Sequence, residues 1–245
     1  KHNITHDVCG KLVVATNERE SSMLPKLMDN GLQNGLQGLK IINANEIKQI
    51  EPYVQGISAI HVPETGIIDY KQVARTISQE IYRVNSKSRI LTNSQVISCK
   101  TMNKKSIVHV KNQTFYSEHV VFCGGLFSDR LAKMDKCETD LKIVGFRGDY
   151  FCLSEKAKQK VNHLIYPVPN PEFPFLGVHF TRMTTGEVEC GPNAVFTFKR
   201  EGYNKTDFSF KDTIDALSYL GTWQLFRKHW RFGLNEMLKA GSKRI

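Results

Sequence analysis

Short apolar runs bounded by glycine, proline and asparagine recur along the chain, and this pattern is typical of β-strands. In the run at residues 143–153 the side chains alternate, with Phe146 and Tyr150 on one side and Arg147 and Asp149 on the other. The other runs that predict strands are residues 11–15, 39–42, 58–62, 89–92, 96–99, 107–110, 114–116, 120–122, 175–182 and 187–190.

Helices are indicated where apolar side chains recur every three or four residues. Asp69 stands where it can cap a helix whose apolar stripe consists of Val73, Ile77, Ile81 and Val84. A stripe of this kind predicts packing against the core. Further helices are predicted at residues 17–30, 45–50 and 223–237. Helices interspersed with short strands predict an α/β chain.

The stretch at residues 118–134, EHVVFCGGLFSDRLAKM, joins an apolar run to a helix through two glycines. We expect residues 120–122 to form a strand that stops before Gly124 and Gly125. Paired glycines allow a backbone to come very close to another group. Ser128 lies where the following helix begins, and that end of a helix favours an anion or a cofactor edge. An ordinary strand–turn–helix connection would show the same pattern, so the stretch alone supports both interpretations.

Composition and charge narrow the function classes. The chain has 245 residues, 40% of them hydrophobic, which is enough for one large domain or two modest ones. The net charge of +10 suits nucleic acid, an anionic membrane face or an acidic small substrate. The basic residues are spread along the chain, which argues against nucleic acid. The six cysteines contain no CxxC motif and are expected to be reduced. The histidines show no metal-ligand spacing, so we expect no metal.

Six blocks in order resemble one enzyme family. They are CGKLVVATNERE, EPYVQGISAIHVPETGIIDY, VVFCGGLFSDR, GFRGDYF, IYPVPNPEFPFLGVHFTRM and GPNAVFTFKREGY. Over nearly its whole length the chain is similar to the L-2-hydroxyglutarate dehydrogenases, which are FAD-dependent enzymes of the D-amino-acid-oxidase-like superfamily. The resemblance implies oxidation of L-2-hydroxyglutarate to 2-oxoglutarate. The segments GLQNG and GIIDYKQVA resemble the animal form more than the bacterial form, which implies mitochondria; a bacterial protein would be membrane-associated or cytoplasmic.

The sequence departs from this family at both ends. Family members open with a strand–GxGxxG–helix motif that binds the FAD diphosphate and end with a block that lies against the flavin, and neither occurs here. The resemblance therefore implies a partial FAD-binding Rossmann-like domain interleaved with an antiparallel or mixed β-sheet substrate domain. We expect substrate-domain strands at residues 8–65, flavin-domain elements at 66–140, and substrate-domain elements with C-terminal helices at 141–245. Residues 1–245 alone are expected to be colourless, inactive and poorly soluble.

The resemblance also implies which residues meet the cofactor and the substrate. Cofactor contacts are expected at Val96, Cys123, Gly124, Gly125 and Ser128. In this chemistry a hydride leaves C2 of the substrate for the flavin while a base takes the hydroxyl proton. His179 is the best candidate base, because a neutral imidazole titrates near working pH. A structural histidine in a sheet is the alternative for His179, and a histidine outside these residues is the alternative base.

The substrate carries two carboxylates, which are best held by arginine, lysine, tyrosine or backbone N–H groups. Arg147 lies between Gly145 and Gly148, so its guanidinium has room to bind a carboxylate through two nitrogens. Its alternative is a salt bridge to the adjacent Asp149 or to Glu201. Other candidates for substrate binding are Tyr166, Asn193, Lys199 and Arg200.

Two other functions remain open from the sequence. One is another flavin oxidase of the superfamily, acting on an amino acid or on glycerol phosphate. The other is a truncated, non-catalytic product. The expected partners of an enzyme are a small dicarboxylate and an electron acceptor, for which a quinone pool at the membrane periphery is a candidate.

Overall fold

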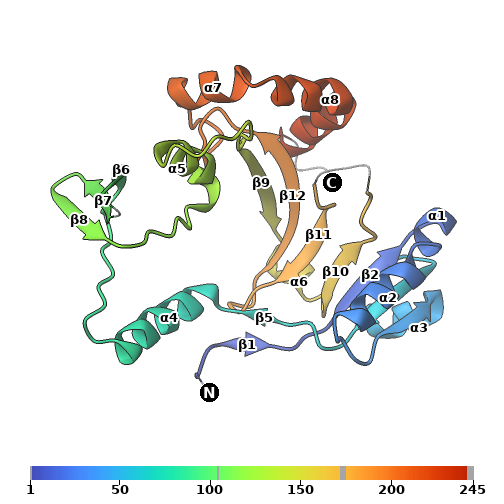
Figure 1. Ribbon diagram of the computed structural model, residues 1–245. Helices are drawn as coiled ribbons and strands as arrows, with labels where there is room; N and C mark the ends of the chain where they lie inside the picture. Colours follow the sequence, from blue (N-terminus) through green and yellow to red (C-terminus); the bar gives the residue numbers. More distant parts are fainter. Residues whose placement is uncertain (1, 104, 172–174, 242–245) are drawn as a thin grey trace. The chain divides into compact units, whose positions relative to one another are not determined.

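The structure is a computed structural model that describes residues 2–103, 105–171 and 175–241 (Figure 1). The described residues form two compact units. The first contains the residues up to Ser86 together with Gly148–Ala194, and the second contains Lys87–Arg147 and Val195–Gly241. Each unit is therefore built from segments that are far apart in the sequence. The assignment of segments to a flavin domain and a substrate domain remains a prediction.

A mixed sheet of seven strands organises the first unit (Figure 1). Strands β2 and β10 run parallel, with Leu12 opposite Ile165, whereas the ladders β3–β4, β2–β4, β10–β11 and β11–β12 are antiparallel. In spatial order the strands are β3 (Lys40–Asn43), β4 (Ser58–Val62), β2 (Lys11–Ala15), β10 (Leu164–Pro167), β11 (His179–Arg182), β12 (Val188–Phe196) and β9 (Phe146–Cys152). The last two strands continue into residues of the second unit.

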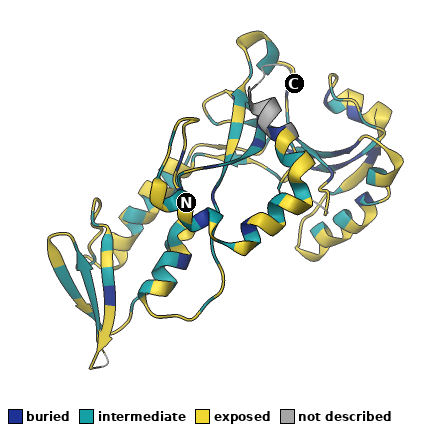
Figure 2. Cartoon of the chain, turned by 90° about the horizontal axis from the view of Figure 1, so that it is seen from above, coloured by how far each residue is buried: buried dark blue, intermediate teal, exposed yellow. Residues whose placement is uncertain are grey.

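Helices cover the two faces of this sheet differently. On one face, Leu12, Val14 and Ile165 pack against Ile47 of α3 (Ala44–Ile50). The opposite face packs against α2 (Leu24–Gln33) through a cluster that contains Ala15, Leu24, Ile60, Val62 and Val168. Buried residues are therefore concentrated in the strands (Figure 2). On the face packed against α2, Tyr166 of β10 lies beside Val13 of β2, which packs against the same cluster.

Local sequence explains where the helices begin. The side chain of Asn43 accepts hydrogen bonds from the backbone N–H groups of Asn45 and Glu46, and the Glu46 carboxylate accepts the N–H of Asn43. This reciprocal pair satisfies N–H groups that a helix start leaves free. The Asp69 side chain caps α4 (Tyr70–Val84), as its sequence predicts, by accepting the backbone N–H groups of Lys71 and Gln72. Shorter elements of the unit are α1 (Glu18–Ser21), α6 (Glu155–Lys158), β1 (His6–Asp7) and β5 (Ile67–Ile68).

The second unit combines a small sheet with helices. Strands β6 (Val96–Met102), β7 (Lys105–Val110) and β8 (Gln113–Ser117) form an antiparallel meander. The helical elements are η1 (Gly125–Phe127), α5 (Ser128–Met134), α7 (Phe210–Leu217) and α8 (Leu220–Gly241). His229 departs from helical backbone angles, so α8 consists of two helices joined at a kink. With strands and helices in both units, the predicted mixed α/β class is confirmed.

Several predicted elements differ from the structure. Residues 120–122 and 89–92 are not strands, and Val121 is 83% exposed, because no described strand pairs with either segment. The expected helix at residues 17–30 is interrupted between α1 and α2. Strand β11 begins at His179, so residues 175–178 of the run predicted at 175–182 do not form a strand. The prediction of a buried stripe on α4 is also wrong for the described residues, since Ile77 is 56% exposed and the helix has no buried residue.

Candidate functional site

An aromatic cluster lies on strands β9, β10 and β11 of the large sheet. The rings of Tyr166 on β10 and His179 on β11 are stacked, with centroids 4.1 Å apart and planes 17° from parallel. Tyr150 on β9 meets the same imidazole edge-on, with centroids 6.3 Å apart. Gly191 on β12 lies opposite His179, and a Cβ there would come within 2.7 Å of the Tyr150 ring. The glycine thus leaves the space that the tyrosine occupies. We call Tyr150, Tyr166 and His179 the aromatic cluster.

The hydrogen bond of His179 sets its proton arrangement. The imidazole is buried, and its Nδ1 lies 2.9 Å from the carbonyl oxygen of Gly177. A carbonyl oxygen can only accept a hydrogen bond, so Nδ1 carries the proton in the neutral ring. Nε2 then holds a lone pair and makes no hydrogen bond to any described residue. An imidazole in this tautomer can take a proton from a bound hydroxyl group through Nε2.

A partly buried lysine lies beside the aromatic cluster. The Lys11 ammonium lies 5.3 Å from the centre of the Tyr166 ring, a cation–π distance. Burial lowers the pKa of Lys11, because the charged form loses water. Burial also raises the pKa of Tyr150, and nearby Tyr166 and Glu189 raise it further. Tyr150 therefore presents a neutral hydroxyl group, which can donate a hydrogen bond to an anionic ligand.

Asn193 lies on the neighbouring strand β12, two residues beyond Gly191 and past the cis Gly191–Pro192 peptide bond. Asn193 is 4% exposed. An amide side chain can both donate and accept hydrogen bonds, so it suits a polar ligand. The structure therefore stacks Tyr166 on His179 and places Asn193 on the strand next to β11. The sequence analysis did not identify Lys11 or Tyr150 as site residues. The position of Lys11, a charged residue at the start of the apolar run KLVVA, could have indicated it.

Arg147 and Lys199 belong to the second unit. Nη1 of Arg147 donates to the carbonyl oxygen of Asn204 at 2.8 Å. The carboxylate of Asp207 accepts the backbone N–H of Asn204 at 3.1 Å. That hydrogen bond, with a smaller contribution from the charge of Lys199, lowers the pKa of Asp207. Both cations thus border the turn at residues 203–207, and Arg147 is half-buried there.

Arg200 lies in a buried group of charges in the same unit. Its guanidinium forms a two-nitrogen ion pair with Asp129 and a second ion pair with Asp215 at 3.0 Å. Arg130 pairs with Asp212 at 2.5 Å, and Lys142 pairs with Asp215 at 3.1 Å. We call these six residues the ionic cluster; it contains Asp129, Arg130, Lys142, Arg200, Asp212 and Asp215. Three positive and three negative side chains balance, so the formal charge of the cluster is zero.

Three of the predicted cofactor contacts, Cys123, Gly124 and Gly125, lie in a turn at residues 123–127, here called the glycine turn. Gly125 has a φ of +48°, and a Cβ placed there would meet no atom within 4 Å. A Cβ on Gly124 would instead lie 2.2 Å from Cδ1 of Leu131 on α5. Gly124 therefore permits the packing of the turn on its helix, while Gly125 leaves its backbone open to another group. Val96 and Ser128 begin β6 and α5, and Cys123 is exposed.

A second histidine group lies elsewhere in the first unit. The Glu51 carboxylate is fully buried, and its Oε1 accepts hydrogen bonds from the N–H of Asn162 at 2.8 Å and from the N–H and Nδ1 of His163. Its Oε2 has no partner among the described residues. The ring of His61 meets His163 edge-on at 6.1 Å, and burial lowers the pKa of His61. Three donors on one oxygen indicate a structural anchor for the start of β10.

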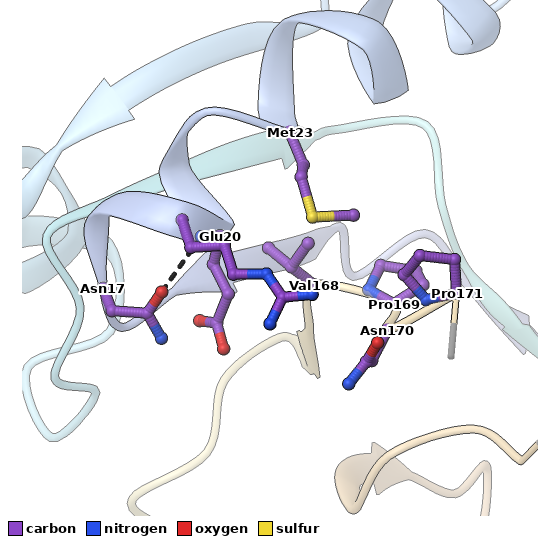
Figure 3. A pocket seen from close by; sticks show the side chains of 8 residues that line it. Asn17, Glu20, Met23, Val168, Pro169, Asn170 and Pro171 are labelled. Atoms are coloured by element: carbon purple, nitrogen blue, oxygen red, sulfur yellow. Dashed lines mark hydrogen bonds between the residues drawn. The ribbon is translucent and has the colours of Figure 1, made fainter. Parts of the chain in front are cut away.

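One pocket of about 120 Å³ opens in the first unit (Figure 3). Its polar groups are already engaged: Asn17 accepts the N–H of Glu20 at 3.0 Å, and the Glu20 carboxylate accepts the N–H of Thr16 at 2.7 Å. Met23, Val168 and two prolines supply the apolar wall. The full lining consists of Asn17, Arg19, Glu20, Met23, Val168, Pro169, Asn170 and Pro171. Because its polar groups serve the cap of α1, the pocket itself indicates no ligand.

Comparison with known proteins identifies the class to which this fold and site belong. Residues 1–228 match the family described as FAD dependent oxidoreductase, and the chain belongs to that family. Among its relatives, an L-2-hydroxyglutarate dehydrogenase of Indibacter alkaliphilus is 42% identical over 245 residues, which are all of this chain and 61% of that protein. The mitochondrial L-2-hydroxyglutarate dehydrogenase of Homo sapiens is 41% identical over 97% of this chain and 53% of its own length. The predicted resemblance is confirmed, and the chain spans between half and two thirds of these relatives.

Solved structures agree on the fold. The L-α-glycerophosphate oxidase of Mycoplasma pneumoniae, solved with FAD bound, aligns with a TM-score of 0.63 over 81% of this chain and 51% of its own, at 23% identity. The L-proline dehydrogenase of P. horikoshii aligns with a TM-score of 0.64 over 91% of this chain and 58% of its own, at 13% identity. At these identities the likeness establishes the arrangement of helices and strands, and nothing about the substrate.

Proposed function

We propose that this chain forms the central part of an FAD-dependent dehydrogenase that oxidises L-2-hydroxyglutarate to 2-oxoglutarate. The names and the 41–42% identity of the two relatives support the substrate. The observation that carries the chemistry is the hydrogen bond from Nδ1 of His179 to the Gly177 carbonyl, since it leaves the lone pair of Nε2 for proton transfer.

His179 is the proposed base. Its Nε2 accepts the proton of the C2 hydroxyl group as the C2 hydride departs, and the C–O bond becomes a carbonyl. The imidazole is stacked on Tyr166 and flanked by Tyr150, so its ring orientation is restricted before the substrate arrives. A base that is already oriented lowers the entropic cost of reaching the reactive geometry. Burial also keeps bulk water from competing with the substrate for Nε2.

FAD is the proposed cofactor and supplies the acceptor for the hydride. The glycine turn fits such a group, because Gly125 leaves backbone open where a side chain would stand. Val96, Cys123, Gly124 and Ser128 complete the proposed contacts. All of them lie in the second unit.

The substrate carboxylates are proposed to bind Arg147, Lys199, Tyr166 and Asn193. Asn193 offers a buried amide and Tyr166 a hydroxyl group, each of which can donate a hydrogen bond to a carboxylate. Arg147 and Lys199 supply positive charge. Arg200 was predicted to share this role, but its guanidinium already binds two carboxylates of the protein, and we give it another role below.

The test uses protein produced from the complete reading frame. We expect a yellow protein whose flavin absorption is bleached anaerobically by L-2-hydroxyglutarate, and which reduces an artificial electron acceptor with this substrate. Glycine, L-proline and glycerol 3-phosphate serve as competing substrates in the same assay. Turnover of one of these in place of L-2-hydroxyglutarate would reassign the substrate, and a colourless, inactive protein would favour a non-catalytic product.

Location and electron acceptor are proposed more broadly. A bacterial and a mitochondrial relative are almost equally similar to the chain, so these identities favour neither location. In the described residues no helix is both long and apolar enough to cross a membrane. We propose a quinone pool as the acceptor, reached from the membrane periphery, and mitochondria as the location in an animal source. Reduction of a short-chain quinone by the purified protein, and its recovery with membranes, test this proposal.

A further inference from the structure

Arg200 contacts the glycine turn and the helix that follows it. Nη1 of Arg200 donates to the carbonyl oxygen of Leu126 at 3.2 Å and to Asp129 Oδ1. Leu126 directly follows Gly125, and Asp129 lies in the first turn of α5. One guanidinium therefore holds both the end of the glycine turn and the beginning of its helix.

The guanidinium has little left to offer a substrate. Each terminal nitrogen of an arginine carries two N–H bonds. Those of Nη1 reach Leu126 and Asp129, and those of Nη2 reach Asp129 Oδ2 and Asp215 Oδ2, both at 3.0 Å. The side chain is only 4% exposed. A substrate carboxylate would have to displace a buried ion pair, which is costly.

Other hydrogen bonds of Asp129 and Arg200 join the start of α5 to segments that are distant in the sequence. Asp129 Oδ2 accepts the backbone N–H of Ile143 at 3.0 Å, and the N–H of Arg200 donates to Asp212 at 3.0 Å. Asp212 lies on α7, so the start of α5 is joined to residues before β9 and to α7. Within the turn, the carbonyl oxygens of Gly124 and Gly125 accept the backbone N–H groups of Phe127 and Ser128. Nothing lies within 4 Å of the Cβ position of Gly125, so the hydrogen bond that Arg200 makes to the turn is at Leu126.

We propose that Arg200 is a positioning residue for the glycine turn, which it holds in its cofactor-facing conformation by joining the Leu126 carbonyl to Asp129. This rests on the proposed function in so far as the turn faces FAD. Arg200 acts on FAD affinity and not on the substrate carboxylates. Lysine cannot replace it, because one ammonium group cannot span the planar set of acceptors.

The experiment compares Arg200→Lys with the wild type in protein from the complete reading frame. Hydrogen exchange of the peptide that covers residues 120–131 reports the turn directly, with or without flavin. Titration of the apoprotein with FAD gives its Kd, and steady-state kinetics at saturating FAD give the KM for L-2-hydroxyglutarate. We expect faster exchange in this peptide, an FAD Kd raised about tenfold or more, and a KM within about twofold of the wild type.

Two further variants keep the test decisive. Asp129→Asn retains the shape of the side chain and weakens the same contacts, so it should change exchange and FAD Kd in the same direction but less, even if Arg200→Lys folds poorly. Lys211→Gln removes an exposed positive charge on α7 and should match the wild type. A raised KM with unchanged exchange and FAD Kd in Arg200→Lys would overturn the proposal and restore Arg200 to the substrate. If the wild type binds no flavin, the proposed cofactor fails, and exchange at residues 120–131 alone decides the role of Arg200.

Discussion

Nδ1 of His179 lies 2.9 Å from the carbonyl oxygen of Gly177, two residues earlier in the chain. The bond spans the start of β11, so the strand boundary and the tautomer of the histidine depend on the same local backbone. Gly177 is also close-packed, because a Cβ there would come within 2.8 Å of Pro167 on β10. The orientation of the proposed base is thus set by backbone packing between two strands.

Replacing His179 tests the base. In the complete protein, His179→Gln should lower kcat by about 10²–10⁴-fold, because general-base catalysis contributes that much. Flavin content should not change. His109→Gln, in the small sheet of the second unit, is a matched control and should keep wild-type kcat. Steady-state kinetics and flavin absorbance measure both quantities, and a glutamine variant with full kcat would place the base elsewhere.

Gly125 can be tested for space and for backbone conformation separately. Valine is strained at a φ of +48°, whereas asparagine tolerates positive φ. If a cofactor occupies the open side of the turn, both Gly125→Val and Gly125→Asn should lower FAD occupancy several-fold. Gly186→Asn is the control, since Gly186 has a φ of +88° and an equally open surrounding in the first unit. Normal occupancy in Gly125→Asn would mean that the glycine serves only the turn.

Arg147→Lys tests substrate binding. A lysine cannot form the paired contact with a carboxylate, so kcat/KM should fall about tenfold or more while FAD content stays constant. Arg182→Lys is a matched control, because Arg182 also donates to an asparagine carbonyl, that of Asn162, at 2.7 Å. We expect it to keep kcat/KM near the wild-type value. Equal losses in the two variants would indicate that Arg147 only ties down the turn at residues 203–207.

The ionic cluster should make the second unit sensitive to acid. Burial alone would raise the pKa of Asp215, but hydrogen bonds from Lys142 and Arg130 outweigh it and lower that pKa; Arg200 and Ile143 lower the pKa of Asp129 against the same effect of burial. Carboxylates with lowered pKa values contribute stability that is complete above their unfolded pKa, about 4, and lost as pH falls through the folded values.

This predicts an unfolding free energy that falls steeply below about pH 4. Asp215→Asn should lower stability near pH 7 and make the acid dependence shallower. Urea unfolding at several pH values can follow tryptophan fluorescence, because Trp223 and Trp230 both lie in α8 of the second unit. An unchanged acid slope in Asp215→Asn would show that this carboxylate does not titrate with folding.

The exposed stripe of α4 predicts association of residues 1–245 expressed alone. Ile77 and Ile81 are 56% and 41% exposed, and contiguous apolar surface favours self-association. The double variant Ile77→Lys/Ile81→Lys should raise the monomeric fraction in light scattering. Gln79→Lys adds the same type of charge at an exposed polar position of the helix and should change little. Monomeric wild-type chain at micromolar concentration would contradict this prediction.

Local patterns predicted the elements whose partners lie nearby or whose ends carry strong signals. Strands β2 and β4 match their predicted residues, and Asp69 caps α4 as predicted. The run at 120–122 looks like a strand by its apolar side chains, but a strand also needs a neighbour, which the described residues do not supply. Exposure of the α4 stripe has the same cause, since periodicity shows which face is apolar and not what covers it.

The candidate site was also predicted only in part. The sequence singled out His179, Tyr166 and Asn193, and the structure places them on β11, β10 and β12. The stacking of Tyr166 on His179 depends on the register of β10 against β11, and no local pattern contains that register. Arg200 shows the opposite case: its residue type suggested a carboxylate partner, and the partners proved to be Asp129 and Asp215 of the same unit.

The parallel pairing of β2 with β10 also bears on how the chain acquires its structure during synthesis. Leu12 finds its partner Ile165 only after all of residues 87–147, which belong to the second unit, have left the ribosome. The N-terminal strands β2, β3 and β4 must therefore wait with one edge of their sheet unpaired. Such late, long-range closure slows folding and exposes a strand edge to other chains. A chaperone that shields β2 during translation would consequently be expected to raise the yield of native protein.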